Sequence, residues 1–383
     1  MAVHQLNTGG VQKAFLEALD AIDYDRYDVT VYIRKKRLDL LPLINDRVSE
    51  VIVNEDHHHY HRRPRAVWLL FLRWFWRTIR KDSSKCNERL NEYLLDQQFR
   101  FEKKQYFQNR KFDIAISYIQ GYTAKFLVDC IDAKRKIMFY HGSTDELHAL
   151  HEELFRVFSA IYCVSQPAQK EIRRLYPAHA DKIQCLENVV DAERVRTKAK
   201  EFEVPAPNDR IVLCTCGRFA RVKGFDRAVE AAAMLRDAGV PFLWYFVGDG
   251  PKREALERQI EEKGLRDYIM ITGMQDNPYP YIKACDIYVQ PSREEAQPLS
   301  VIEAQILCRP IVSTRTAVGL ALVQHGETGV LTESDPSALA AAISGLAGDA
   351  ALKARIEDAL GKIDHQAKQR RFREQWAALL EGK

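Results

Sequence analysis

The chain has 383 residues, of which 46% are hydrophobic, and it carries 57 basic and 53 acidic side chains. A chain of this length is too long to fold around one ordinary hydrophobic core, which predicts two domains of roughly 150–200 residues each. The formal net charge of +4 is too balanced to favour nucleic acid as a partner. Eight cysteines stand without a C-x-x-C pair or metal spacing, which predicts reduced, buried thiols.

The N-terminal residues, Met1–Leu6, lack the basic and apolar regions of a signal peptide. No run of eighteen apolar residues follows, so we expect a cytoplasmic protein without a membrane span. After Met1, only Ala2, Val3 and Leu6 are apolar before Gly9-Gly10, and the first strand is therefore expected to be short or to start upstream.

Strand-like runs alternate with amphipathic helices along the chain, which predicts parallel α/β layers. In the first half, apolar residues recur at helical spacing between Val11 and Ile22. The strands expected in this half are Tyr27–Ile33, Phe112–Ser117, Lys136–Tyr140 and Ala160–Val164.

The second half repeats the alternation. A helix is expected at 225–238 and the last helix at about 363–380, with strands at 210–216, 241–247, 269–272, 285–290 and 311–314. The charged stretch 194–208 contains two prolines and predicts a linker. The expected division is a first domain over 1–198, a second over 209–362 and a C-terminal segment over 363–383. Two doubly wound domains facing each other across a cleft would bind ligands at the carboxyl ends of their strands.

Two carboxylates, Glu295 and Glu303, lie eight residues apart around an expected strand-to-helix junction. Pro298 suits the first position of that helix, because its φ is already helical and its missing N–H would be unpaired there. Glu295 then lies in the loop, and Glu303 lies in the second turn on the side facing the loop. A helix N-terminus attracts phosphate and carboxylates accept hydrogen bonds from sugar hydroxyls, so the arrangement suits a nucleotide sugar.

Two cations, Arg218 and Lys223, follow the strand expected at 210–216 and lie at its carboxyl end. Fixed cations there can neutralise a departing diphosphate. The simpler alternative is a solvated basic loop, but Gly224 and the two carboxylates favour phosphate contact. Arg221 is assigned to the surface.

Three further positions are candidates at the ends of strands. The turn at Gly248 is not a dinucleotide fingerprint, because Arg253 stands where G-x-G-x-x-G needs its last glycine. Gly9-Gly10 precedes a helix, where glycine lets the backbone approach a ligand closely or simply makes a turn. His141 ends a strand facing the cleft and can hydrogen-bond a sugar hydroxyl, although a lone histidine is more often structural.

Two unusual segments lie near the middle of the first half. The tract His57–His61 predicts no metal site, because contiguous histidines in a loop do not fix a coordination geometry. The segment Pro64–Lys81 mixes three tryptophans and several leucines with arginines, which suits a helix in a membrane interface. An amphipathic helix packed on its own domain is the alternative.

Taken together, the motifs resemble those of the family 4 retaining glycosyltransferases, also called glycosyl transferases group 1, which have the GT-B fold. The resemblance covers nearly the whole chain. Beside the two glutamates, it rests on motifs in the family's order, namely Gly9-Gly10, Tyr140-His141, Asn188–Asp191, Gly217-Arg218 with Lys223-Gly224, and the glycine-containing stretches 247–250 and 326–329.

The resemblance implies transfer of a sugar, with retention, from a nucleoside diphosphate sugar such as a UDP-sugar to a glycan or lipid-linked acceptor. The setting would be cell-surface polysaccharide or glycolipid synthesis on the inner face of the membrane, with Pro64–Lys81 on anionic lipid. The family needs no metal or other cofactor, and its last helix crosses back onto the first domain.

The resemblance also implies roles for the candidate residues. The catalytic set is His141, Arg218, Lys223 and Glu295, in which the cations stabilise the diphosphate and Glu295 orients the sugar. Ala296 replaces the glycine common after the first glutamate. Donor contacts are implied for Gly9, Gly10, Arg218, Lys223, Gly248, Pro298, Leu299 and Glu303, with Glu303 on the ribose, Gly248 beside the base, and Pro298-Leu299 holding phosphate.

Two rival functions are compatible with the same fold. A catalytically silent subunit would bind the nucleotide sugar without turnover, although the intact Glu, Arg and Lys set argues against it. A GT-B epimerase or phosphorylase is the second rival, and for it no lysine stands in an evident cofactor-aldimine context.

Overall fold

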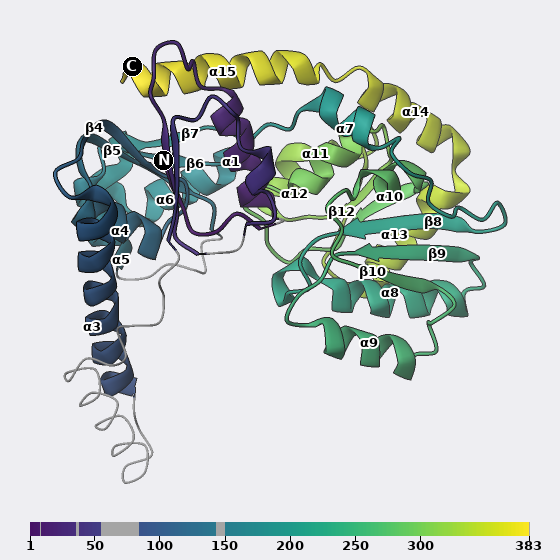
Figure 1. The fold of residues 1–383 in the computed structure, drawn as a ribbon. Coiled ribbons are helices and arrows are strands. Elements are labelled where there is room, and N and C mark those ends of the chain that lie inside the picture. Colours follow the sequence, from purple (N-terminus) through teal and green to yellow (C-terminus); the bar gives the residue numbers. More distant parts are fainter. Residues whose placement is uncertain (8, 36–37, 55–83, 143–149, 383) are drawn as a thin grey trace, which may run out of the picture.

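The computed structural model describes residues 1–7, 9–35, 38–54, 84–142 and 150–382, and Figure 1 shows two α/β domains side by side. The first domain contains a seven-stranded sheet in the order β3-β2-β1-β4-β5-β6-β7, and the second a six-stranded sheet in the order β10-β9-β8-β11-β12-β13. The paired strands run parallel. Strand order reverses at β1 and at β8, and doubly wound sheets bind ligands at such switch points.

The strands are short apolar runs that are mostly buried, as expected for parallel sheets covered by helices on both faces. In the first sheet they are β1 Ala2–Val3, β2 Thr30–Ile33, β3 Glu50–Val53, β4 Lys111–Ser117, β5 Asp132–Tyr140, β6 Ala160–Cys163 and β7 Ile183–Cys185. In the second they are β8 Ile211–Cys216, β9 Phe242–Val247, β10 Ile269–Gly273, β11 Ile287–Gln290, β12 Ile311–Thr314 and β13 Val330–Thr332.

Helices connect these strands. In the first domain they are α1 Gly10–Asp20, α3 Ser84–Glu102, α4 Tyr122–Cys130, α5 Leu150–Val157, α6 Gln166–Leu175 and α7 Ala192–Lys198. The second domain and the C-terminal segment hold α8 Phe225–Asp237, α9 Arg253–Glu262, α10 Tyr279–Ala284, α11 Leu299–Ile306, α12 Ala317–Leu322, α13 Pro336–Gly348, α14 Ala350–Gly361 and α15 His365–Glu381. Short helical turns are η1 Leu41–Leu43, the π-helical η3 Lys103–Phe107, η5 Pro177–Lys182 and η6 Arg221–Lys223.

Two boundaries differ from the sequence expectation. The predicted linker 194–208 is helical in its first part, because the Asp191 side chain caps α7 by accepting from the Arg194 N–H at 2.9 Å. Burial of Ala192 and Val195 then packs this helix onto the domains. Pro298 is the N-cap of α11 rather than its first residue, since its ψ of 99° is extended.

The last helix, α15, returns to the first domain, as the resemblance implied (Figure 1). The Trp376 ring is fully buried and lies 5.4 Å from the Phe139 ring. Arg135, on β5, donates hydrogen bonds of 2.9 Å to the carbonyl oxygens of Leu379 and Leu380. These carbonyls lie in the last turn of a helix, where no following turn supplies the usual partners, so Arg135 fixes the end of α15 on the first sheet.

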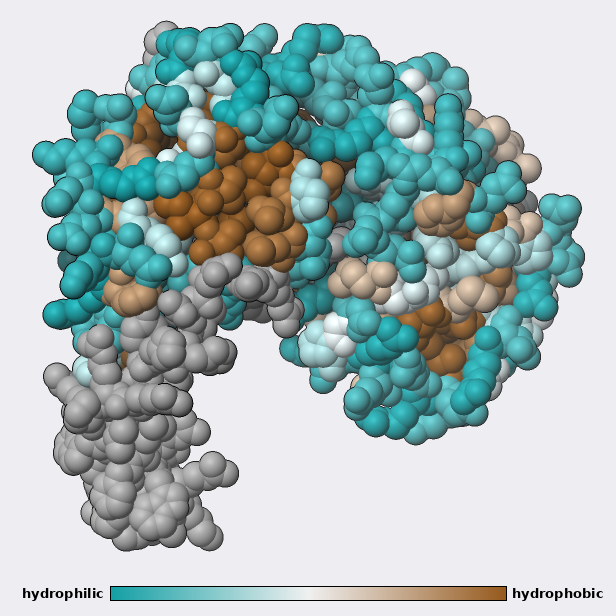
Figure 2. Space-filling model, viewed as in Figure 1, coloured by the Kyte–Doolittle hydropathy of each residue, from teal (hydrophilic) through white to brown (hydrophobic). Residues whose placement is uncertain are grey.

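One buried apolar cluster runs through both domains, from Leu16 in the first to Leu299 in the second and Trp376 in α15. The two domains therefore share a core along part of their boundary. Figure 2 shows a mainly hydrophilic surface on the face toward the viewer, with one broad apolar area on the first domain and a smaller one on the second. Among the described residues, no helix is both long and apolar enough to cross a bilayer.

Candidate functional site

The loop that follows β8 brings a lysine to the boundary between the domains. Lys223 ends the short turn η6, and Gly224 follows with a φ of +70°. A Cβ at Gly224 would lie 2.0 Å from the carbonyl oxygen of Pro291. Only glycine can adopt this left-handed conformation and lie so close to the Pro291 carbonyl. The loop after β8 therefore packs against the loop after β11.

Glu295 lies in that second loop and is held by three side chains. The Lys223 ammonium donates to both carboxylate oxygens at 2.7 Å, and Gln290 and Ser292 donate to Oε1 at 2.9 and 2.7 Å. The Glu295 side chain is only 6% exposed, while that of Lys223 is 28% exposed. Within the described residues Oε2 accepts from Lys223 alone, so it can still accept from a sugar hydroxyl.

Glu295 and Lys223 line a cavity of about 240 Å³ that residues of both domains enclose. Gly10, His141 and Asn188 line its first-domain side. The structure thus brings together three of the four residues predicted to be catalytic. They come from the carboxyl ends of strands in both sheets, where doubly wound domains bind their ligands.

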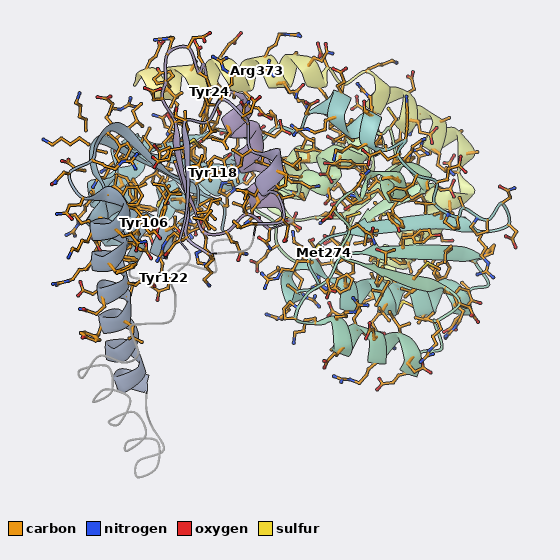
Figure 3. The ribbon with its side chains drawn as sticks, in the orientation of Figure 1. Tyr24, Tyr106, Tyr118, Tyr122, Met274 and Arg373 are labelled. Atoms are coloured by element: carbon orange, nitrogen blue, oxygen red, sulfur yellow. The ribbon has the colours of Figure 1, made fainter. Side chains whose placement is uncertain are left out.

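His141 is half-buried at the first-domain side of this cavity, and its ring nitrogen Nε2 is buried. Its backbone N–H donates to the Gln120 side chain at 3.0 Å, and its ring lies 5.1 Å from the Tyr118 ring, labelled in Figure 3. Burial lowers the pKa of His141 to about 3, so the imidazole is neutral at pH 7. Its Nε2 has no hydrogen-bond partner among the described residues, and such a buried group calls for one.

Gln297 and Asn188 join the two domains beside the cavity. The Asn188 N–H donates to Gln297 Oε1 at 2.8 Å, and Gln297 Nε2 donates to the Asn188 carbonyl at 3.2 Å. Both residues line the cavity, yet neither was predicted as a site residue. Gln297 stands between the two glutamates and Asn188 begins a family-like motif, so position alone could have indicated them.

Glu303 lies apart from Glu295. Its side chain is 3% exposed, and its Oε1 accepts from the Lys13 ammonium at 2.9 Å. It lines a smaller cavity of about 60 Å³ with Lys13 and Tyr279. Of the described residues that line the two cavities, only Leu299 lines both. The two carboxylates therefore face separate spaces. Lys13 was not predicted as a site residue, although it follows Gly10 by three positions.

The N-terminus of α11 lies between the two carboxylates. Pro298 and Leu299 are buried there, and no side chain caps the helix. The N–H groups of an uncapped first turn need acceptors, and phosphate oxygens meet this need well. This geometry is compatible with the phosphate contact predicted for these two residues.

The structure gives less direct support for the other residues predicted to contact the donor. Gly248 has a φ of +149°, and a Cβ there would lie 2.0 Å from the Gly217 carbonyl oxygen, so the loops after β8 and β9 touch. Gly10 lines the larger cavity, whereas Gly9 does not. Arg218 is exposed and lies outside both cavities, and its side chain makes no hydrogen bond or ion pair with a described residue.

Sequence analysis did not single out Met274, which lies beside the loop after β9. The Gly248 N–H donates to the Gly273 carbonyl at 2.9 Å, and Met274, the next residue, is half exposed. Figure 3 shows Met274 on the side of the second domain that is nearer the first. A methionine in a loop carries no sequence signal for this position.

Two sequence predictions fall on residues that the structure does not describe. The tract His57–His61 and the segment Pro64–Lys81 both lie outside the described ranges. Within those ranges, no group of three or more His, Cys, Asp or Glu side chains could hold a metal ion.

Two parallel α/β domains on either side of a shared cavity have the architecture of the GT-B class of protein. Residues 210–349 match the family model described as glycosyl transferases group 1. The second domain thus matches this family, in agreement with the resemblance drawn from the motifs.

Curated relatives agree with the family model. Alpha-D-kanosaminyltransferase of Streptomyces kanamyceticus is 30% identical over 183 residues, which cover 46% of this chain and 47% of the relative. The lipopolysaccharide core biosynthesis glycosyltransferase LpsD of Rhizobium meliloti is 33% identical over 155 residues, covering 40% and 44%. The chain spans about half the length of the curated relatives it matches.

Solved structures match the whole chain. HepE of Anabaena, in complex with UDP and glucose, has a TM-score of 0.73 at 16% identity and covers 100% of this chain and 98% of its own. WaaG, described as a glycosyltransferase involved in lipopolysaccharide biosynthesis, has a TM-score of 0.61 at 14% identity and covers 97% and 98%. At such identities the likeness shows the fold, which is GT-B.

Proposed function

We propose that this chain is a retaining glycosyltransferase that transfers a sugar from a nucleoside diphosphate sugar to a glycan or lipid-linked acceptor. The observation that carries the proposal is the cavity of about 240 Å³ lined by His141, Lys223 and Glu295. The names of LpsD and of the kanosaminyltransferase support sugar transfer, and the UDP bound by HepE supports a nucleoside diphosphate donor.

In this proposal the donor's diphosphate lies at the N-terminus of α11. The first-turn N–H groups donate hydrogen bonds to its oxygens, and Lys223 has one ammonium hydrogen beyond the two it gives to Glu295. Arg218, exposed in the same loop, supplies the second cation by reaching toward the phosphates. Stabilising the charge that develops on a leaving diphosphate is the main electrostatic task of the site.

The sugar and the ribose are assigned to different carboxylates. Glu295 accepts a sugar hydroxyl through Oε2, and His141 exchanges a hydrogen bond with another hydroxyl through its unpartnered Nε2. Glu303, on the far side of Leu299, accepts from the ribose. The separation of the two cavities supports this division of the donor.

The transfer step breaks the bond between the anomeric carbon and the phosphate oxygen, whose electron pair leaves with the diphosphate. The acceptor oxygen bonds to the anomeric carbon from the same face, and its proton passes to the departing phosphate oxygen. Glu295 already accepts hydrogen bonds from Lys223, Gln290 and Ser292, which argues against a role as a covalent nucleophile. Retention then follows from attack on the vacated face.

The test of this function measures release of free nucleoside diphosphate from a panel of nucleoside diphosphate sugars, with candidate acceptors present. We expect Lys223→Ala and Arg218→Ala each to lower turnover about a hundredfold or more while the fold survives, because each removes a cation from the leaving group.

Two control variants match these changes. Lys263 forms a 2.8 Å ion pair with Glu230 on the second domain, away from both cavities, and Arg221 is an exposed cation of the same loop as Arg218. Lys263→Ala and Arg221→Ala should keep turnover within a few fold. Near-normal rates for both cation variants at saturating donor would show the phosphate assignment to be wrong. Binding of a donor without any release would favour the silent subunit.

Peripheral attachment to the inner face of an anionic membrane, through Pro64–Lys81, completes the proposal. It stays a prediction from the sequence, since that segment lies outside the described residues.

A further inference from the structure

Lys13 reaches from the first domain into the second. It lies on α1, three residues beyond Gly10, and Figure 1 shows this helix on the side of its domain that faces α11. Its ammonium donates to Glu303 Oε1 at 2.9 Å and to the Tyr279 hydroxyl at 3.4 Å, and it lies 4.8 Å from the centre of the Tyr279 ring. Every one of these partners belongs to the second domain.

The pair is largely removed from water. The Glu303 side chain is 3% exposed and that of Lys13 is 24% exposed. Burial by itself would lower the pKa of Lys13, but the Glu303 carboxylate and the Tyr279 hydroxyl outweigh it and hold the pKa above its ordinary value. Lys13 is therefore charged throughout the neutral range. A buried carboxylate without such a partner would carry a large desolvation penalty.

Lys13 occupies only one oxygen of Glu303. Oε1 accepts from the ammonium, whereas Oε2 makes no hydrogen bond with any residue in the described part of the chain. A carboxylate held on one oxygen by a fixed cation presents its other oxygen in a defined direction. Ribose carries two neighbouring hydroxyl donors, and these suit an acceptor held in this way.

We propose that Lys13 is a positioning residue for the donor nucleotide, which holds Glu303 through Oε1 so that Oε2 meets the ribose hydroxyls. This inference rests on the proposed function, in which Glu303 binds the ribose. It adds that ribose recognition depends on both domains, because the side chain that orients the acceptor comes from the first domain. Nucleotide affinity and the closure of the domains are then coupled.

The experiment compares ribose with dideoxyribose. Calorimetry is carried out on the full chain with UDP, ADP and GDP, each beside its 2′,3′-dideoxy counterpart, and the tightest-binding pair is used. We expect the wild type to prefer the ribose form by about ten- to a hundredfold, because hydrogen bonds to a charged group are lost without the hydroxyls. Lys13→Met should reduce this preference to less than threefold, and Lys13→Arg should largely restore it.

A purely structural role for Lys13 predicts a different result. If Lys13 only joins the domains, Lys13→Met weakens both ligands equally and the preference keeps its wild-type value, which would overturn the inference. Arg26→Met is the matched control. Arg26 also forms an ion pair between distant parts of the chain, with Glu381 at 2.7 Å, but it lines neither cavity. This variant should leave the preference unchanged.

Two further outcomes separate this inference from the proposed function. Binding of nucleoside diphosphate without any preference for ribose in the wild type would reject the ribose role of Glu303, and the role of Lys13 with it. An unchanged preference in Lys13→Met alone rejects only the role of Lys13. Should Lys13→Met not fold, Lys13→Gln takes its place with the same expected loss of preference, because its shorter neutral donor cannot hold Oε1.

Discussion

Burial lowers the pKa of His141 from its ordinary value of 6.5 to about 3, so the unfolded chain binds this proton more readily than the folded one. The stability that depends on neutral His141 is present above pH 6.5 and is lost as the pH falls toward 3, at up to about 1.4 kcal/mol per pH unit. His141→Gln should flatten this dependence between pH 6.5 and 5, as measured by urea unfolding at each pH.

His365 lies outside the site and serves as the control for His141. Burial lowers its pKa to about 4, and it lies at the start of α15. His365→Gln should flatten the same pH dependence while donor binding stays as in the wild type. His141→Gln should change both, because its ring lines the larger cavity. Unaltered donor affinity in His141→Gln would assign this histidine to the fold alone.

Glu295 permits a second test on a single residue. Glu295→Gln should lower turnover while the affinity for bare nucleoside diphosphate stays within a few fold, because its proposed partner is the sugar. Calorimetry with the diphosphate and with the sugar nucleotide distinguishes the two contacts. An equal loss of affinity for both would mean that Glu295 holds the nucleotide or the loop instead.

Some residues of the site could be predicted from the sequence, and others could not. Lys223 and Glu295 could be assigned because each lies in the loop after a recognisable strand, and such loops meet at one edge of a sheet. Lys13 could not, because its partner Glu303 lies 290 residues away and on the other domain. Such contacts depend on how two domains pack, which no local pattern encodes.

At the scale of single elements, the loop between β8 and α8 depends on one glycine. Gly224→Ala combines a left-handed φ with a Cβ 2.0 Å from the Pro291 carbonyl oxygen, so we expect a loss of about 2–5 kcal/mol in the free energy of unfolding. Gly239→Ala is the control, since Gly239 has a similar φ of +73° but open space around its Cβ. It should cost about 1–2 kcal/mol. Equal losses in chemical denaturation would show that the close approach to Pro291 is unimportant.

Elements differ in how well the sequence indicated them. Long apolar runs such as β9 and periodic helices such as α8 were predicted within one residue at each end. The strands β3, β7 and β13 were missed, because each has only three or four residues and an apolar run that short has no distinct period. Strand β1 lies inside its sheet, between β2 and β4, although it has only two residues. Its place therefore depends on pairing with its neighbours rather than on its length.

For the whole molecule, the docking of α15 is a measurable source of stability. Trp376 is fully buried, and Trp376→Ala should lower the free energy of unfolding by about 3–5 kcal/mol. Arg373 is exposed on the same helix, as Figure 3 shows, and Arg373→Ala should change stability by less than 0.5 kcal/mol, within the range of about ±0.5 for surface changes. Guanidinium unfolding measures both. A loss below about 1 kcal/mol for Trp376→Ala would mean that α15 is only loosely attached.

The predicted membrane surface is also a property of the whole molecule. Changing both Trp74 and Trp76 to Ser should release the protein from anionic vesicles with little change in melting temperature, because apolar burial and attraction to anionic lipid act together there. Neutral vesicles are the control and should bind the wild type weakly. Failure of the wild type to co-sediment with anionic vesicles at low salt would contradict the membrane assignment.

Because α15 packs on the first domain, that domain cannot complete its core until the end of the chain has been synthesised. Arg135 and its partner Leu380 lie 245 residues apart, and the side of the Phe139 ring that Trp376 covers stays open until Trp376 has emerged from the ribosome. At about 5–20 residues per second, this interval is roughly 10–50 s. We expect the nascent first domain to spend that time with part of its apolar core open to solvent and to chaperones. The second domain, with a buried cluster of its own, can close first.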